Sequence, residues 1–382
     1  MQEKEILSIY TYILQLLKQR RLADAFGKLQ PLLEELQDWN YTNRKEELET
    51  VYRNLLQYAV LGVNDPQQQR IFNQLLEDCY DLVSSIKEAL LTRVSSRVEY
   101  AQKRYAQIAP SQLNELVSTL ELDASHHALG ELLTTGLQDE GQKATQFAVE
   151  HEQHLLAVFN FIWLSGKWTP DEKQLVTNLL QSPDIDTTDR SVIISAITLS
   201  LLRNFYPSKL ALLLTLAQHP ELDIRQRILV CIALVVTRYA ERIQLNETCM
   251  NQLTLLCDNK DFRQELESVV MQLVRTSETE SITKRIREEI MPDVIRLTPM
   301  MKDKMDSESL KADELNDKNP EWQELLEQSG VADKLQEFGE LQMDGADVYV
   351  STFAALKSFP FFRNTMNWLL PFDPKHSSIR AL

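Results

Sequence analysis

The stretches PDIDTTDRSVIISA (residues 183–196) and PELDIRQRILVCIA (residues 220–233) align with each other without gaps at an offset of 37 positions. Both carry a proline, an acidic residue, an apolar residue, an aspartate, an arginine and an alanine at equivalent places, and DFRQEL at residues 261–266 resembles residues 223–228. A proline cannot extend the helix before it, and an aspartate at a helix start can accept hydrogen bonds from free backbone amides. Each copy therefore predicts the start of a helix, and each unit predicts a helix pair. We assign these positions to the repeat framework: Pro183, Asp186, Arg190, Pro220, Asp223 and Arg227.

The residues inside the second copy favour helix over strand. Residues 228–236 are apolar on every side, as in a helix enclosed by neighbouring repeats or in a buried parallel strand. The pattern continues through Tyr239 to helical length, and only 9 of 382 residues are glycine, too few for a fold built on tight turns. The predicted fold is all-α, a helical-repeat solenoid in the form of an α-α superhelix.

Residues 1–139 predict an N-terminal region of long amphipathic helices. Apolar residues recur every three to four positions from Ile6 to Leu16 and from Leu22 to Leu36, which predicts two antiparallel helices. Two further helices are expected near residues 44–61 and 66–107. The last of these has nearly heptad spacing, so it pairs either as a coiled coil or as an ordinary bundle helix.

The remainder of the chain divides into three parts by composition. We expect helical repeats at residues 140–301, a charged solvated linker at 302–320 and a C-terminal helical segment at 321–382. The aromatic end of that last segment must be covered by something, so we predict that it makes contacts. Its candidate contact residues are Phe359, Phe361, Phe362, Trp368 and Phe372.

The repeat pattern resembles HEAT repeats through its proline, its helix-starting aspartate, the arginine four residues later and the alanines Ala196 and Ala233. The opening helix pair resembles a tetratricopeptide repeat (TPR) through Ala25, Leu29 and Leu32.

Four other segments resemble a family of large bacterial tetratricopeptide-repeat proteins of unknown function. They are FIWLS (161–165), TLSLLR (198–203), GADVY (345–349) and FPFFRNTMNWLLPF (359–372). The resemblance implies that further helical repeats follow the aromatic segment, and that this chain is the N-terminal portion of a longer protein.

Charge and cysteine usage limit the classes of partner. The chain has 40 basic and 56 acidic residues, a formal charge of −16, which opposes binding to nucleic acid or to an anionic bilayer. It has no signal-peptide pattern and no run of the ~20 apolar residues that a membrane span needs, so we expect a cytoplasmic protein. The four cysteines lie in apolar helical patterns and are expected to be buried and free: Cys79, Cys231, Cys249 and Cys257.

Motifs with possible chemistry are few. His151 and His154 share a helix face, but metal sites on helices use His at i and i+4, or Glu three before His. The adjacent His126 and His127 point to different faces, and residues 136–143 imitate a phosphate loop but place Gln142 where Lys is needed. We therefore predict no catalytic residue, no metal and no cofactor.

Two function classes follow. The favoured one is a non-catalytic scaffold that presents a helical-repeat surface to a protein or peptide partner. The alternative is a metal-dependent enzyme, or a helical domain that regulates an enzyme, using His151 and His154. Self-assembly through the terminal aromatic residues is a third possibility.

Overall fold

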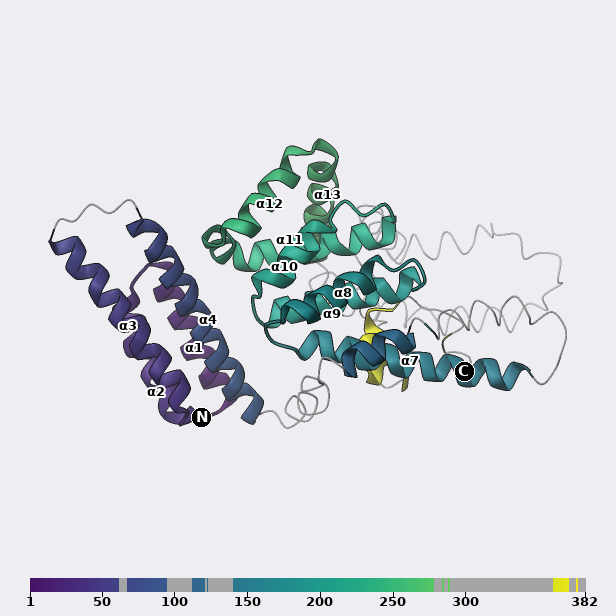
Figure 1. Ribbon diagram of the computed structural model, residues 1–382, viewed down its shortest axis with the longest axis horizontal. Helices are drawn as coiled ribbons and strands as arrows, with labels where there is room; N and C mark the ends of the chain where they lie inside the picture. The colour runs from purple at the N-terminus through teal and green to yellow at the C-terminus, as the bar shows by residue number, and fades with distance from the viewer. Residues whose placement is uncertain are drawn as a thin grey trace. The chain divides into compact units, whose positions relative to one another are not determined.

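The computed structural model describes residues 1–61, 67–94, 112–120, 122, 140–277 and 360–370, with residues 284, 288 and 376. Every regular element within these residues is a helix, which confirms the predicted all-helical class (Figure 1). The chain divides into two compact units, Met1–Leu266 with Thr365–Leu382, and Glu267–Asn364. Residues 302–359, which include the predicted linker and Phe359, lie outside the described residues, and so does Phe372.

Helices α1 (Glu3–Lys18), α2 (Leu22–Leu36), α3 (Trp39–Val60) and α4 (Gln68–Val94) pack as a bundle in which α4 contacts the other three. The turn between α2 and α3 is formed by residues next to each other in the chain. Gln37 ends α2 in the left-handed region at φ 52°, and the Asp38 side chain then accepts a hydrogen bond from the Asn40 amide to start α3. The helices that the amphipathic spacing predicts therefore pack as a bundle, and the connection from α2 to α3 is short.

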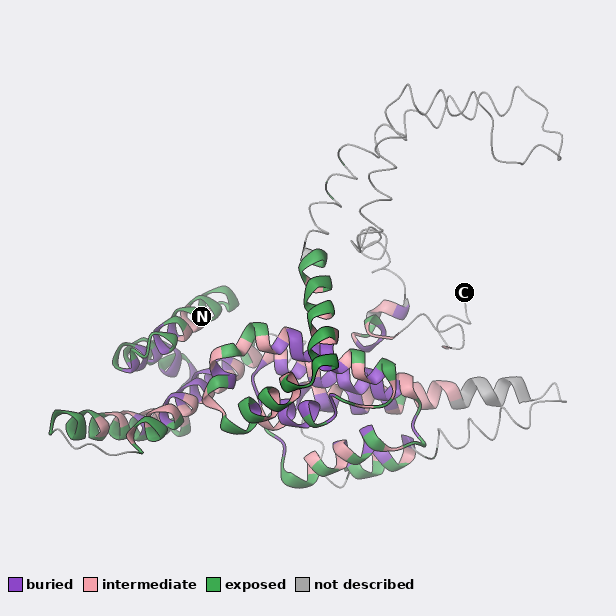
Figure 2. Cartoon of the chain, turned by 90° about the horizontal axis from the view of Figure 1, so that it is seen from above, coloured by how far each residue is buried: buried purple, intermediate pink, exposed green. Residues whose placement is uncertain are grey.

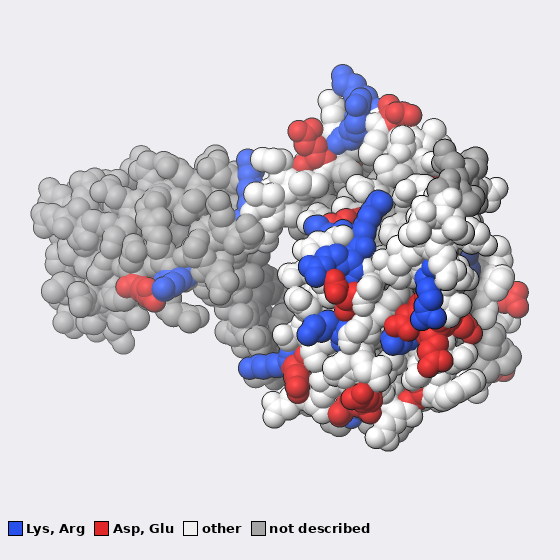
Figure 3. All heavy atoms as spheres, turned by 90° about the vertical axis from the view of Figure 1, so that its left-hand side faces the viewer, with Lys and Arg blue, Asp and Glu red and all other residues white. Residues whose placement is uncertain are grey.

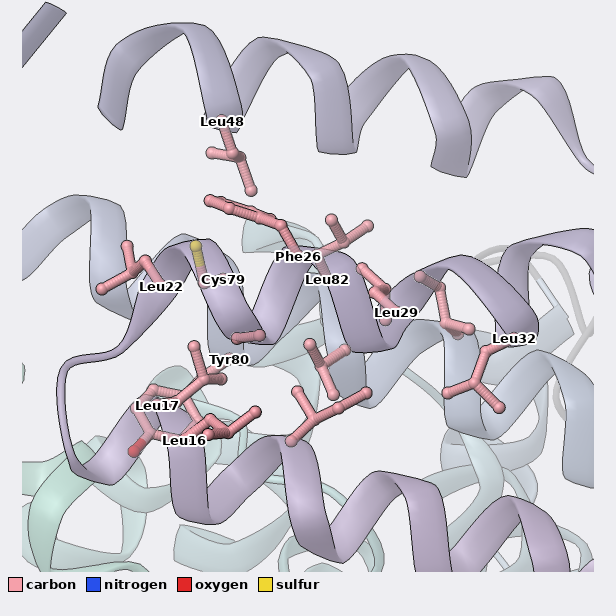
Figure 4. Close-up of a cluster of buried hydrophobic side chains, with 14 of the residues drawn as sticks. Leu16, Leu17, Leu22, Phe26, Leu29, Leu32, Leu48, Cys79, Tyr80 and Leu82 are labelled. Atoms are coloured by element: carbon pink, nitrogen blue, oxygen red, sulfur yellow. The ribbon is translucent and has the colours of Figure 1, made fainter. Parts of the chain in front are cut away.

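All four helices contribute side chains to one hydrophobic cluster (Figure 4). The α4 residues predicted as a seam are buried over the middle of the helix, from Leu75 to Leu90, whereas Ile71 and Val94 at its two ends are exposed. The buried α4 residues pack against helices of the same chain, which is the ordinary bundle arrangement. Other members of the cluster include Ile6, Ile13, Leu17, Leu22, Leu29, Leu32 and Leu48.

The second group of helices consists of α7 (Glu140–Leu164), α8 (Pro170–Gln181), α9 (Thr187–Arg203), α10 (Pro207–Thr215), α11 (Leu222–Leu245), α12 (Glu247–Asp258) and α13 (Lys260–Ser277). Helix α9 packs between α7 and α11, and α10 packs against α12 and α8, so the helices alternate between two layers. Pro170 and Pro207 occupy the first turns of α8 and α10, where a missing amide hydrogen is harmless.

The aligned stretches form equivalent elements. Residues 187–196 begin α9 and residues 224–233 lie in the first half of α11, and these two helices pack against each other. The apolar run at 228–236 is helical, so the buried-strand alternative is wrong. Ala196 and Ala233, which the alignment pairs, are both buried.

The predicted caps differ between the copies. The Asp186 side chain accepts a hydrogen bond from the Thr188 amide at 3.0 Å, as expected. The prediction is wrong for Asp223, because α11 begins at Leu222 and Asp223 lies inside its first turn. Glu221 stands at the capping position instead, but its carboxylate makes no cap hydrogen bond because it is bonded to α9.

Candidate functional site

Arg190, the first repeat arginine, joins the start of α9 to the start of α11. Its Nη2 atom donates to Glu221 Oε2 at 2.9 Å and to Thr187 Oγ1 at 3.4 Å, and Thr187 Oγ1 donates to the same Glu221 oxygen at 2.6 Å. The hydrogen bond from Thr187, followed by that from Arg190, lowers the pKa of the Glu221 carboxyl. Arg190 is buried and its charge is matched, so its role is to connect two helices.

Arg227, at the equivalent position in the next copy, has different partners. Its Nη1 atom donates to Ser195 Oγ on α9 at 2.9 Å and to the backbone carbonyl of Leu369 at 3.1 Å. Burial lowers the pKa of the Arg227 guanidinium, and the nearby Asp223 carboxylate opposes that shift. Arginine still stays charged at neutral pH, so the carbonyl of Leu369 receives a charge-assisted hydrogen bond.

Leu369 belongs to a short C-terminal segment, residues 365–370, that lies with α11 in the same compact unit. The segment contains the 3-10 helix η5 (Met366–Trp368), and the Leu369 amide donates to the Met366 carbonyl at 2.9 Å. Met366 and Asn367 are 2% and 4% exposed, respectively, whereas Trp368 is 42% exposed. The buried residues of this segment are therefore Met366 and Asn367 rather than the neighbouring tryptophan.

The aromatic contact residues that the sequence singled out are only partly described. Phe361 lies in helix η4 (Pro360–Arg363), is buried, and meets the Phe362 ring edge to face at a centroid distance of 5.0 Å. Phe361 is 4% exposed, while Trp368 keeps a large exposed surface, and the role of these residues as contacts stays a prediction. Sequence reasoning missed Met366 and the Leu369 carbonyl, because a backbone acceptor has no side-chain signature.

The two histidines raised as metal ligands lie on α7. His151 Nε2 is 2.8 Å from Asp189 Oδ2, which links α7 to α9, and Glu152 Oε2 is 3.6 Å from His376 Nε2 beyond the C-terminal segment. Within the described residues, no three His, Cys, Asp or Glu side chains come together in a group that could hold a metal ion. The contacts of His151 and Glu152 instead connect α7 to other parts of the chain.

A buried lysine closes the C-terminal end of α7. Lys209 Nζ donates to the carbonyls of Ile162 and Ser165, and to the hydroxyls of Ser165 and Ser200, at 2.8 to 3.3 Å. The ammonium also lies 4.5 Å from the ring centroid of Trp168. Lys209 is 0% exposed, and burial lowers its pKa to about 7. An amine enclosed in this way positions the end of a helix and is not open to a substrate.

Acidic side chains of α4 pair with basic side chains of the second group of helices. Asp81 forms ion pairs with Arg242 and, at 2.6 Å, with Lys167, and Glu88 pairs with Arg203. The cations Arg203 and Arg242 are largely shielded from solvent. These contacts join α4 to the C-terminal part of α9, the end of α11 and the turn after α7.

Together, these contacts link the C-terminal residues to two helices, through the Leu369 carbonyl on Arg227 of α11 and through His376 near Glu152 of α7. On the face shown in Figure 3, Lys and Arg side chains are interspersed with Asp and Glu among uncharged residues. No helix within the described residues is long and apolar enough to span a bilayer. No family model, no curated protein and no solved structure matches the chain.

Proposed function

We propose that this protein is a non-catalytic scaffold of TPR-like or HEAT-like helical repeats that binds a protein or peptide partner. The docking surface in this proposal is the face of α7, α9 and α11. The observation that carries it is the hydrogen bond from Arg227 Nη1 to the Leu369 carbonyl, because the chain there already holds a peptide segment.

The chemistry of this contact can be transferred to another peptide. A guanidinium that binds a backbone carbonyl recognises a group that every peptide carries, and a buried side chain such as Met366 supplies selectivity. The intramolecular segment has the advantage of high effective concentration, so a partner must displace it. The scaffold is therefore proposed to have a self-occupied docking face.

The test uses the full chain and a fluorescent peptide of residues 360–372, PFFRNTMNWLLPF. The variant Met366→Asp prevents the internal segment from seating, because an ionised carboxylate cannot replace a buried thioether without a large desolvation penalty. We expect this variant to bind the peptide with saturation, at least about tenfold more tightly than the unchanged chain.

A second substitution identifies the contact. Met366→Asp combined with Arg227→Ala should lose roughly tenfold or more of that affinity, since charge-assisted hydrogen bonds contribute about 1.5 to 3 kcal/mol. The matched control combines Met366→Asp with Arg238→Ala, which removes an exposed arginine from the same helix. Peptide binding that is absent from the Met366→Asp chain, or equal in both double variants, would refute the proposal.

A further inference from the structure

The end of α3, from Leu55 to Leu61, carries apolar side chains at every position except Gln57, and several of them are exposed. Exposed fractions are 48% for Leu56, 56% for Tyr58, 86% for Val60 and 74% for Leu61, and Ile71 at the start of α4 is 40% exposed. We call these five residues the hairpin tip. A cluster of large apolar side chains that are exposed on one element marks a candidate interaction site.

The rest of the bundle does not cover the hairpin tip. Arg20, just after α1, lies over the Phe72 ring at 5.7 Å, so the α1–α2 turn reaches α4 one residue beyond Ile71. In Figures 1 and 2 the α3 end reaches past that turn, and Figure 2 colours it as exposed. The hairpin tip therefore has the position and exposure of a contact surface.

The tip also carries very little charge. Residues 50–76 contain three charged side chains, Arg53, Asp65 and Arg70, in a chain of which 25% is charged. Depletion of charge with enrichment of aromatic and aliphatic residues is the composition of the core of a protein interface. Because few charges would lose water, covering this surface has a small desolvation penalty.

We propose that the hairpin tip is the contact surface of a homodimer, in which two copies pair tip to tip about a twofold axis. A twofold contact places the same patch on both sides, and an uncharged apolar patch is complementary to itself. The chain as a whole has a formal charge of −16, which repels a second copy, so a nearly neutral projecting tip is where self-association is least opposed. Pairing would surround each α3 end with a second helical hairpin.

The size of the patch sets the expected strength. At the exposed fractions given above, five side chains of ~150–200 Å² each offer roughly 500 Å² per copy, or about 1,000 Å² in total. This is at the low end for specific interfaces, so the dimer should be weak and dependent on concentration. Salt should strengthen it, because screening reduces the repulsion between the acidic bodies while the apolar contact persists.

Sedimentation velocity on the full chain tests this proposal. Because the interface is expected to be weak, protein concentrations between about 1 and 100 µM are compared. The expected result is a mass that rises from 44.2 kDa toward twice that value, more steeply at high salt. The double variant Val60→Glu with Leu61→Glu should stay monomeric throughout. Both side chains are more than 70% exposed, so the change should not unfold the bundle, and circular dichroism checks this.

Leu255→Glu on α12 is the matched control, because Leu255 is 73% exposed and lies outside the tip, and it should dimerise like the unchanged chain. The proposal is overturned if the unchanged chain remains monomeric, or if the tip variant associates as strongly as the control. It is also overturned if Trp368→Ala rather than the tip variant abolishes association, since the terminal aromatic residues would then form the interface.

Discussion

Replacement of Lys209 by methionine should change how the stability of the protein depends on pH. The ammonium is fully enclosed, and burial lowers its pKa from 10.5 to about 7 in the folded chain. Between those two pH values the unfolded chain binds the proton and the folded chain does not. The free energy of unfolding should therefore rise as pH increases through 7. Below that range both states are protonated, so Lys209 should cause no change of stability with pH, although burial of its charge still lowers the stability there.

The magnitude follows from the size of the shift. Each pH unit within the window corresponds to about 1.4 kcal/mol, so the gain between pH 7 and pH 9 is at most roughly 2 to 3 kcal/mol. The four oxygen acceptors and the ring of Trp168 favour the charged ammonium, which makes this figure an upper bound. Lys209→Met removes the proton and keeps an apolar chain of similar length.

The assay is urea unfolding of both chains at intervals between pH 6.5 and 9. The unchanged chain should gain stability relative to Lys209→Met as pH rises. The control Lys4→Met, at an exposed position on α1, keeps Lys209, so its stability relative to the unchanged chain should not change with pH. The buried thiols have raised pKa values that make stability fall near pH 9 and above, but they are present in both chains, so their effect cancels in the difference: Cys79, Cys231 and Cys249. A stability difference between the unchanged chain and Lys209→Met that stays constant across the whole range would refute the reasoning.

Two further changes test the helix start of α9 and the ion pairs of α4 by thermal and urea unfolding. Asp186→Ala should lose about 1 kcal/mol of stability because it removes a helix cap. Asp223→Ala should lose clearly less, because Asp223 is not a cap, and equal losses in the two variants would contradict this assignment. Asp81→Asn should lose roughly 3 kcal/mol, since it leaves the shielded cation of Arg242 without its carboxylate. Asp78→Asn, at an exposed pair, should lose under about 1 kcal/mol, and a reversed order would contradict this account.

The features that the sequence predicted correctly depend on residues close together in the chain. The cap at Asp186 is formed within one turn of the helix that it begins. The spacing of buried α4 residues likewise reflects a single helix period. Local patterns of this kind could therefore predict the helical class and the helical conformation of the two aligned stretches.

The features that the sequence did not predict connect distant residues. Lys209 bonds Ser165 across 44 positions, and Asp81 pairs with Arg242 across 161 positions. A lysine or an aspartate among apolar residues gives no indication of which partner it will meet after folding. The prediction that Asp223 caps α11 was wrong. The residue at the capping position is Glu221, and its carboxylate bonds Arg190 on α9, a contact that the local sequence does not indicate.

The difference between the two repeat arginines points to where function resides in such a chain. Arg190 and Arg227 occupy equivalent positions, yet Arg190 on α9 bonds Glu221 just before α11, whereas Arg227 on α11 bonds Ser195 on α9. Ser195 is aligned with Ile232, so a hydroxyl stands in α9 where the next copy has an aliphatic side chain. This departure from the repeat lets Arg227 turn toward α9 and still donate to the Leu369 carbonyl. The shared positions build the helices, and the position that differs supports the proposed docking contact.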